Sequence, residues 1–232
     1  MIIVISGATG GVGTAIANFF SSNGYNTVLL GRDVEKLNDL SESIKSKYGT
    51  YSNYYFCDAN NQKSIEDCIN SINTKYDKLE MLINVAGVFP YGLAMELSGK
   101  LYDECMSVNL RLPFLLSTGM FGSLKKNKGG KVINIGSSSA YAGFKNTAIY
   151  CASKHALLGL SRSLNDEWKE LGVTVHCVSP GTIDTSMADV LEQDRSTYIG
   201  PDEFAQLVYD VASYNGNMLI EEVGRLEGWY DE

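Results

Sequence analysis

The sequence predicts an α/β domain built on a doubly wound parallel sheet of about seven strands, with helices on both faces. Two observations support this fold class. Short apolar segments alternate with longer amphipathic segments along nearly the whole chain. The apolar segments are also nearly continuous, which is typical of parallel strands buried on both faces. No linker, repeat or low-complexity segment interrupts this order, so residues 1–232 are predicted to form one domain.

Seven segments have the length and composition of strands. Most of them contain a run of β-branched or leucine residues that is bounded by glycine, asparagine or another turn residue. The first begins directly after Met1 and leads into a glycine-rich turn. The predicted strands span residues 2–6, 27–30, 53–57, 79–84, 132–135, 173–178 and 218–223.

The segments between these strands have helical signals. Asp33 is predicted to cap the second helix, and Gly172 to end the fifth. Pro201 suits the first position of the last helix, whereas Pro113 is expected to interrupt a long helical stretch. The predicted helices span residues 12–22, 34–47, 62–75, 98–126, 148–171 and 201–213, and residues 180–200 are expected to form a loop with room for a short helix.

Composition and charge exclude several classes of protein. The net charge is −8 and the isoelectric point is about 4.9, without the basic stripe of a nucleic-acid-binding protein. No apolar run approaches the roughly 20 residues that span a membrane, and the N-terminus lacks the basic region of a signal peptide. His155 and His176 are not spaced as metal ligands. Five scattered cysteines suggest reduced thiols, so we expect a cytoplasmic protein without a metal centre.

A glycine-rich turn lies between the first predicted strand and the first predicted helix, from Gly7 to Gly13. Its glycines permit a tight bend, close approach of the backbone to a pyrophosphate, and packing of the helix on the strand. The N–H groups at the start of the helix would face the phosphates. Because residues 10 and 11 are both glycine, the spacing fits both G-x-x-x-G-x-G and G-x-x-G-x-x-G. The turn therefore predicts a dinucleotide-binding site of the Rossmann type.

Arg32 and Asp33 follow the second strand and offer two interpretations of the cofactor. A carboxylate about 20 residues past the glycines favours NAD, through a ribose hydroxyl, whereas an arginine there favours the phosphate of NADP. Because Asp33 is assigned to capping the next helix, Arg32 is left beside the ribose. We therefore expect NADP(H) to be favoured, with NAD(H) possible.

A tyrosine followed four residues later by a lysine occurs at Tyr141/Lys145 and again at Tyr150/Lys154. Composition alone predicts this spacing roughly once by chance, so its context decides. The first pair flanks Gly143 in a predicted loop. The second opens a helix rich in alanine and leucine, where residues four apart share a face. Tyr150 and Lys154 are therefore the candidate proton-transfer pair.

Reduction of a carbonyl group requires a hydride on carbon and a proton on oxygen. The pKa of a free tyrosine is near 10, and a nearby ammonium favours the phenolate. We therefore expect Lys154 to lower the pKa of Tyr150, so that the phenol serves as a general acid/base. Ser137 would hydrogen-bond the substrate oxygen as charge develops on it. Its neighbours Ser138 and Ser139 are alternatives, although the strand phase and the spacing to Tyr150 favour Ser137.

With these residues in place, the chain resembles the short-chain dehydrogenase/reductase family, in its short single-domain branch. The resemblance covers nearly the whole chain. In two positions the chain departs from the family pattern, since Ser6 stands where threonine is usual and Val85 where a second asparagine is common. The second departure puts a local hydrogen bond in doubt. The resemblance is carried by Ser6 with the glycine turn, Asp58, Asn84-Val85-Ala86-Gly87, Asn109, Ser137, Tyr150-Cys151-Ala152-Ser153-Lys154, and Pro180 to Thr185.

The resemblance implies a Rossmann-type domain with the substrate site in its C-terminal half. It implies that Lys154 holds the nicotinamide ribose and that Asn109 places a water that relays protons to Lys154. Asp58 resembles an adenine contact, and it could also cap a turn. The implied catalytic residues are Asn109, Ser137, Tyr150 and Lys154. The implied cofactor contacts are Gly7, Thr9, Gly11, Val12, Gly13, Arg32, Asp58, Ala59, Asn84, Ala86, Gly87, Tyr150, Lys154, Pro180, Gly181, Ile183 and Thr185.

These observations predict an NADP(H)-dependent carbonyl reductase or alcohol dehydrogenase. The alternative is a catalytically silent NAD(P)-binding sensor or structural protein on the same scaffold, which has no need of all four catalytic residues. By resemblance, the helices near 98–126 and 148–171 assemble a homodimer or homotetramer. The loops around 88–96, 138–147 and 184–200 show no diagnostic charge pattern. Ketone, aldehyde, sugar and acyl-thioester substrates therefore all stay open.

Overall fold

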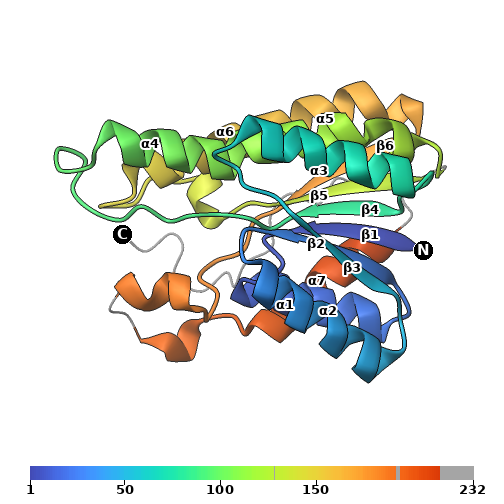
Figure 1. Ribbon diagram of the computed structural model, residues 1–232. Helices are drawn as coiled ribbons and strands as arrows, with labels where there is room; N and C mark the ends of the chain where they lie inside the picture. Colours follow the sequence, from blue (N-terminus) through green and yellow to red (C-terminus); the bar gives the residue numbers. More distant parts are fainter. Residues whose placement is uncertain (128, 192–193, 215–232) are drawn as a thin grey trace.

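The computed structural model describes residues 1–127, 129–191 and 194–214, and it arranges them in three layers, with a sheet between two sets of helices (Figure 1). The six strands of these residues run parallel in the order β3-β2-β1-β4-β5-β6. The order reverses between β1 and β4, which is the switch point of a doubly wound sheet. The strands are β1 Ile2–Ser6, β2 Asn26–Gly31, β3 Ser52–Phe56, β4 Met81–Asn84, β5 Gly130–Ile135 and β6 Val173–Val178.

The predicted fold class is therefore confirmed, with six of the seven predicted strands present. The seventh, over residues 218–223, lies outside the described residues. The fourth strand begins later than residue 79. The N–H of Leu79 donates to the carbonyl of Ser123 at 3.1 Å. Leu79 is therefore hydrogen-bonded to the helix over Leu112–Lys125 and not to a neighbouring strand.

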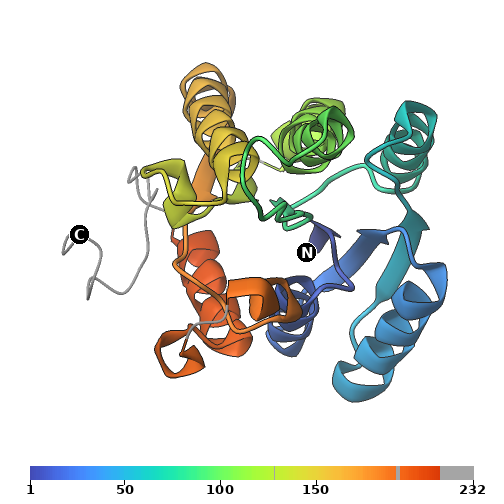
Figure 2. The same cartoon turned by 90° about the vertical axis from the view of Figure 1, so that its left-hand side faces the viewer.

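The helices cover both faces of the sheet, as the two views in Figures 1 and 2 agree. Helices α1, α2 and α7 lie on one face, and α3, α4, α5 and α6 lie on the other. Each face has its own apolar core, because successive strand residues point to opposite sides. The helices are α1 Gly11–Ser22, α2 Val34–Tyr48, α3 Gln62–Lys75, α4 Gly99–Met106, α5 Leu112–Lys125, α6 Ala148–Trp168 and α7 Pro201–Ser213.

The predicted helix ends are largely confirmed. The carboxylate of Asp33 accepts a hydrogen bond from the N–H of Lys36 at 3.1 Å, so Asp33 caps α2. Pro201 lies in the first turn of α7, and Gly172 closes a short 3-10 turn after α6 with a left-handed φ of 84°. The described residues of the segment 180–200 form a loop with two 3-10 turns, at Ser186–Leu191 and Arg195–Thr197.

The long helical stretch is not interrupted at Pro113, which corrects the prediction. Pro113 lies buried in the first turn of α5. The irregularity comes earlier, in a π-helical turn over Ser107–Arg111, where the N–H of Leu112 donates to the carbonyl of Ser107 five residues back. A proline ring clashes with the carbonyl four residues before it. The wider turn relieves this clash, so the chain continues as a helix in almost the same direction.

The described residues contain no helix that is both long enough and apolar enough to cross a membrane. Within the same residues, no group of three or more His, Cys, Asp and Glu side chains could hold a metal ion. All five cysteines lie within the described residues; they are buried, and none of them forms a disulfide.

Candidate active site

The glycine turn is shaped by steric contacts that only glycine satisfies. Gly7 has a left-handed φ of 66°, and a Cβ there would lie 2.6 Å from the Cα of Ala86. A Cβ on Gly13 would lie 2.1 Å from the carbonyl oxygen of Gly7. Both distances are shorter than van der Waals contact. The turn after β1 therefore packs directly on the segment after β4 and on the first turn of α1.

Ser6 reinforces this contact with hydrogen bonds. Its hydroxyl oxygen accepts from the N–H of Val85 at 3.2 Å and from the N–H of Ala86 at 3.4 Å. The hydroxyl of Ser6 therefore ties the end of β1 to the start of the loop after β4. It does so although valine replaces the asparagine that is common at position 85. Ala86 and Gly87 are held at the same edge of the sheet by this arrangement.

The start of α1 fits a pyrophosphate group. Its N-cap residue, Gly10, makes no side-chain capping bond, and the first turn of the helix carries no acidic residue. The first N–H groups of a helix have no partner within it, and they attract anions. Gly11 also leaves room for the loop after β6, because a Cβ there would lie 2.7 Å from the Cγ2 of Thr185. The backbone of residues 7–13 is thus a cradle that side chains would fill.

The residues expected near the adenine ribose have different surroundings. Arg32 is exposed after β2, next to the capping residue Asp33. The carboxylate of Asp58 accepts from the N–H of Asn60 at 3.0 Å, so it caps a turn, and Ala59 is buried in the core. No contact of these residues bears on the choice between NADP and NAD.

Asn84 lies inside the protein rather than at its edge. Its side chain is 2% exposed and donates to Asn134 at 2.8 Å and to Ser117 at 3.3 Å. Asn134 donates in turn to Ser161 on α6, at 2.8 Å. These side chains form a buried polar network between the sheet and the helices α5 and α6. The expected ribose contact would have to come from the backbone of Asn84, because its Nδ2 is engaged by Asn134 and Ser117 and its Oδ1 is buried without a hydrogen-bond partner among the described residues.

The tyrosine, lysine and serine expected to act in catalysis come together at the carboxyl ends of β5 and β6. Ser137 follows β5, and Tyr150 and Lys154 lie in the first turns of α6. The ammonium of Lys154 donates to the carbonyl of Ile135 at 2.8 Å, and it lies 5.6 Å from the centre of the Tyr150 ring. Tyr141 and Lys145 lie in the loop before α6, as predicted.

The pKa values of this pair differ from the expectation. Burial raises the pKa of Tyr150 to about 12, against the opposing effect of a hydrogen bond with Ser137. Burial lowers the pKa of Lys154 to about 8. The predicted lowering of the tyrosine pKa by the lysine is therefore wrong for this structure. The reason is that burial disfavours the charged phenolate, and the one effect that lowers the tyrosine pKa comes from Ser137, while the ammonium of Lys154 is held on the carbonyl of Ile135.

Asn109 is fully buried in the π-helical turn, and its amide group is engaged on all sides. Its Oδ1 accepts from the N–H of Val88 at 2.9 Å. Its Nδ2 lies within hydrogen-bond distance of the Val88 carbonyl at 3.0 Å, of Ser153 Oγ at 3.0 Å and of Cys105 Sγ at 3.3 Å. Asn109 thus fixes the loop after β4 to α6 beside Lys154. The water relay stays an expectation.

Hydrogen bonds and ion pairs hold the described part of the loop after β6 in place. The carbonyl of Pro180 accepts from the N–H of Ser138 at 2.8 Å, and Ile183 forms an isolated parallel bridge with Ile199. Arg195 donates to the carbonyl of Thr185 at 3.1 Å. Its guanidinium also pairs with the carboxylates of Asp184 at 3.1 Å and Asp189 at 2.7 Å. These contacts hold Thr185 against the glycine turn.

Sequence reasoning missed three contributors to this site. Ser153 was visible beside Lys154 but was not singled out, although it bonds Asn109. Asn134 was a polar residue within an apolar strand, which is a signal that a buried partner exists. The carbonyl of Ile135 carries no side-chain signal at all, so only the structure could identify it as the acceptor for Lys154.

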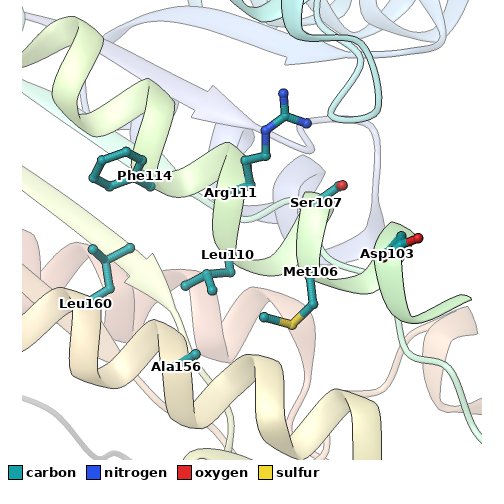
Figure 3. Close-up of a pocket in the computed structure, with 8 residues that line it drawn as sticks. All are labelled: Asp103, Met106, Ser107, Leu110, Arg111, Phe114, Ala156 and Leu160. Atoms are coloured by element: carbon teal, nitrogen blue, oxygen red, sulfur yellow. The ribbon is translucent and has the colours of Figure 1, made fainter. Parts of the chain in front are cut away.

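A separate hollow of about 700 Å³ lies on the outer face of the helices (Figure 3). Helix α4, the π-helical turn and α5 line one side of it, and Ala156 and Leu160 of α6 line the other. None of the catalytic side chains lines it. The hollow is therefore a feature of the helical surface and not of the catalytic edge.

The fold and the site together define a Rossmann-type domain with a dinucleotide-binding glycine turn and a tyrosine–lysine pair. A family model described as short chain dehydrogenase matches residues 1–196. The chain therefore belongs to the short-chain dehydrogenase/reductase family, an oxidoreductase family that depends on NAD(P).

Curated relatives agree with this assignment. A 3-oxoacyl-(acyl-carrier-protein) reductase of Rickettsia felis is 32% identical, over 94% of this chain and 96% of the relative. An uncharacterized oxidoreductase of Thermotoga maritima is 34% identical, over 78% of this chain and 71% of the relative.

Solved structures are similar over almost the whole chain. A metagenomic short-chain oxidoreductase in complex with NADP has a TM-score of 0.83 at 29% identity, covering 96% of this chain and 95% of its own. An alcohol dehydrogenase of Thermococcus sibiricus, complexed with 5-hydroxy-NADP, has a TM-score of 0.88 at 23% identity, covering 97% and 95%. The second likeness shows the fold alone.

Proposed function

We propose that this protein is an NADP(H)-dependent carbonyl reductase in which Tyr150 is the general acid. The observation that carries the proposal is the meeting of Tyr150, Lys154 and Ser137 at the carboxyl edge of the sheet, beside a glycine turn that fits a pyrophosphate. Ligands of doubly wound sheets bind at this edge. A silent cofactor-binding protein would have no need of a buried lysine next to a half-buried tyrosine.

The raised pKa of Tyr150 suits proton donation. A phenol whose pKa is about 12 is protonated at neutral pH, so it is ready to give a proton to a carbonyl oxygen that becomes an alkoxide. Bound NADPH supplies the hydride. The Ser137 oxygen accepts from the N–H of Ser139 at 3.1 Å, and in this proposal its hydroxyl proton, now shared with Tyr150, turns to the substrate oxygen to stabilise the developing charge.

Lys154 replaces the proton that Tyr150 gives up, in this proposal. Its pKa of about 8 lies near neutrality, so the ammonium both exists at pH 7 and releases a proton readily. One of its three N–H groups is used by the Ile135 carbonyl. The other two are available to Tyr150 and to the nicotinamide ribose. Asn109 is a positioning residue that keeps α6 in place.

The preference for NADP(H) rests on Arg32, which is exposed after β2 while Asp33 is occupied as a helix cap. The NADP complex of the similar metagenomic oxidoreductase supports this assignment. The proposed contacts with the cofactor are those implied by the family, with Asn84 contributing only its backbone. For substrates, the similar reductases of Rickettsia make 3-oxoacyl thioesters the first carbonyl compounds to test.

Thermal unfolding with saturating NADPH or NADH, followed by NADPH oxidation with a carbonyl panel, tests the proposal. A ligand at 100 times its dissociation constant stabilises a fold by about 2.7 kcal/mol. We expect Tyr150→Phe to keep the NADPH-dependent shift in Tm and to lose turnover. Normal turnover in Tyr150→Phe would overturn the mechanism, and the absence of any shift would overturn the assignment as an enzyme.

The cofactor preference has its own variant. Arg32→Ala should weaken binding of NADPH much more than binding of NADH, because only NADPH carries the ribose phosphate. Equal weakening of both would show that Arg32 does not read the phosphate. A Tm shift with NADH alone in the unaltered protein would move the assignment to Asp33.

Self-assembly is proposed on the outer face of α4, α5 and α6, as in the family. Support comes from the mainly apolar hollow there and from Leu101, Tyr102 and Phe114, which are each at least 40% exposed. Phe114→Glu should convert a homodimer or homotetramer to smaller species in light scattering. A cytoplasmic location is proposed from the five free thiols.

A further inference from the structure

Phe89 makes direct contact with the proposed general acid. Its ring centre lies 4.7 Å from that of Tyr150, with an interplanar angle of 85°. Such edge-to-face pairs are favourable beyond the apolar area they bury. Phe89 comes from the loop after β4, and Tyr150 comes from α6. The contact therefore places an aromatic ring from a different element directly against the ring of the proposed general acid.

Tyr91 extends this contact away from the catalytic residue. Its ring centre lies 5.8 Å from that of Phe89, and its hydroxyl oxygen accepts from Nδ2 of Asn146 at 3.2 Å. The carbonyl of Asn146 also accepts from the N–H of Gly92 at 2.9 Å. Asn146 has a left-handed φ of 66°, a conformation that asparagine adopts more easily than most residues. These contacts fix the loop after β4 to the loop before α6.

The surfaces of both loops expose apolar side chains. Tyr91 is 40% exposed, Leu93 44%, Met95 90% and Phe144 50%. A single exposed apolar residue is ordinary, but several in two adjoining loops mark a binding surface. Both loops lie at the end of the molecule where the strands finish (Figure 1). An apolar surface beside Tyr150 would attract the apolar part of a substrate.

The geometry points to Phe89 and Tyr91 as an aromatic wall that selects substrates with an apolar, preferably aromatic, group near the carbonyl carbon. This inference rests on the proposed function, since it names the substrate class of the same site. A sugar or a phosphorylated carbonyl compound needs polar or charged partners around it. The two loops offer mainly rings and aliphatic side chains instead, and Glu96 and Lys145 are the charged residues within 88–96 and 138–147.

Two ketones of equal carbonyl reactivity test the wall, namely 2-butanone and 4-phenyl-2-butanone. The ratio of their kcat/KM values with NADPH cancels any change in cofactor binding or in the general acid. We expect the unaltered protein to prefer the phenyl compound by about tenfold or more. Phe89→Ala should reduce the ratio at least about fivefold, and Phe89→Leu, which keeps most of the packing, should reduce it less.

Phe56→Ala is the matched control, because Phe56 is a 50% exposed phenylalanine at the end of β3, at the far edge of the sheet. In Phe56→Ala, the ratio of the kcat/KM values for the two ketones should equal that of the unaltered protein. An unchanged ratio in both Phe89 variants would overturn the inference, as would an equal reduction in Phe56→Ala. If Phe89→Ala does not fold, judged by its Tm, then Phe89→Leu decides alone.

A binding measurement separates this inference from the proposed function. The affinities of both ketones are measured by saturation-transfer NMR in the presence of NADP⁺, which has no hydride to give. Tighter binding of the phenyl compound that is lost in the Phe89 variants supports the wall even if no ketone is reduced, and the proposed function would then fail alone. Turnover without any preference for the phenyl compound overturns the wall and leaves the reductase intact.

Discussion

The two halves of the candidate active site are built differently. The half proposed to bind the cofactor, called the cofactor half, consists of backbone whose shape depends on missing side chains, as at Gly7 and Gly13. The half proposed to carry out catalysis, called the catalytic half, consists of buried polar side chains whose positions depend on hydrogen bonds, as at Asn109 and Lys154. Substitutions that add side-chain atoms should therefore disrupt the structure of the cofactor half, and substitutions that remove side-chain atoms should disrupt the catalytic half.

The difference explains how each half serves its ligand. A pyrophosphate is large and charged, and N–H groups can approach it only where no Cβ intervenes. A proton transfer needs a few groups held to within a fraction of an ångström. Glycines without a Cβ allow the N–H groups to approach a pyrophosphate, and satisfied hydrogen bonds hold the proton-transfer groups in position.

Adding one methyl group to the cofactor half should have the largest effect. In Gly13→Ala the new Cβ would lie 2.1 Å from the Gly7 carbonyl oxygen, and neither backbone can yield. We expect the free energy of unfolding to fall by about 4 kcal/mol or more, with loss of the NADPH-dependent Tm shift. Urea unfolding measures this. Gly159→Ala, on α6 with open space around it, should instead stabilise by up to about 1 kcal/mol.

Removing atoms from the catalytic half comes next. Asn109→Ala leaves the N–H and carbonyl of Val88 without their partner, while the hydroxyl of Ser153 keeps its hydrogen bond to the carbonyl of Tyr150. Each orphaned group costs about 1–3 kcal/mol, so we expect a total loss of about 3 kcal/mol. Chemical denaturation would measure it, with the exposed Asn60→Ala as the control. A loss below about 1 kcal/mol would show that water replaces the amide.

His176 sharpens the comparison because it is a buried polar group outside both halves. Burial and then Lys131 lower its pKa to about 4 from an ordinary 6.5. As pH falls from 6.5 to 4, the unfolded chain takes up a proton that the folded protein does not, so stability falls. The loss should approach about 3 kcal/mol. Unfolding free energies at pH 7 and pH 4.5 should differ less in His176→Gln, and an equal difference would contradict the assignment.

The smallest effect is expected at the exposed ion pairs that anchor the loop over the glycine turn. Asp189→Asn removes one of two carboxylates from Arg195, and both partners are about half exposed. Exposed pairs contribute little, so the free energy of unfolding should change by less than about 1 kcal/mol. Thermal unfolding at low and high salt checks this. A larger loss at low salt would mean that the carboxylates and Arg195 act as a network.

Local patterns in the sequence were enough to identify most of the fold and the central pair of the site. The glycine turn, the cap at Asp33 and the spacing of Tyr150 and Lys154 each depend on residues close together in the chain. Short-range chemistry decides such features, so they can be predicted without a structure. The alternation of strands and helices likewise predicted the parallel sheet.

Features that depend on distant residues could not be predicted. The side chain of Asn84 turns inward because Asn134, fifty residues later, accepts its hydrogen bond. The pKa of Tyr150 rises because its surroundings disfavour a charge on the phenol. The four-residue spacing between Tyr150 and Lys154 predicts that the two side chains are neighbours, but it does not predict how far they are buried. The π-helical turn also escaped prediction, since Pro113 suggested a break where the helix in fact continues.

That wide turn makes the length of its segment as important as its composition. Asn109 points inward to Val88, while Ser107 and Leu110 of the same turn line the outer hollow. A π-helical turn holds one residue more than an α-helical turn. Deleting one residue here would restore the ordinary helical repeat and leave α4 and α5 aligned, but the turn would lose the extra residue that lets it face Val88 and the outer hollow at once. Such a deletion is therefore expected to change the turn, and Asn109 with it, more than the helices on either side.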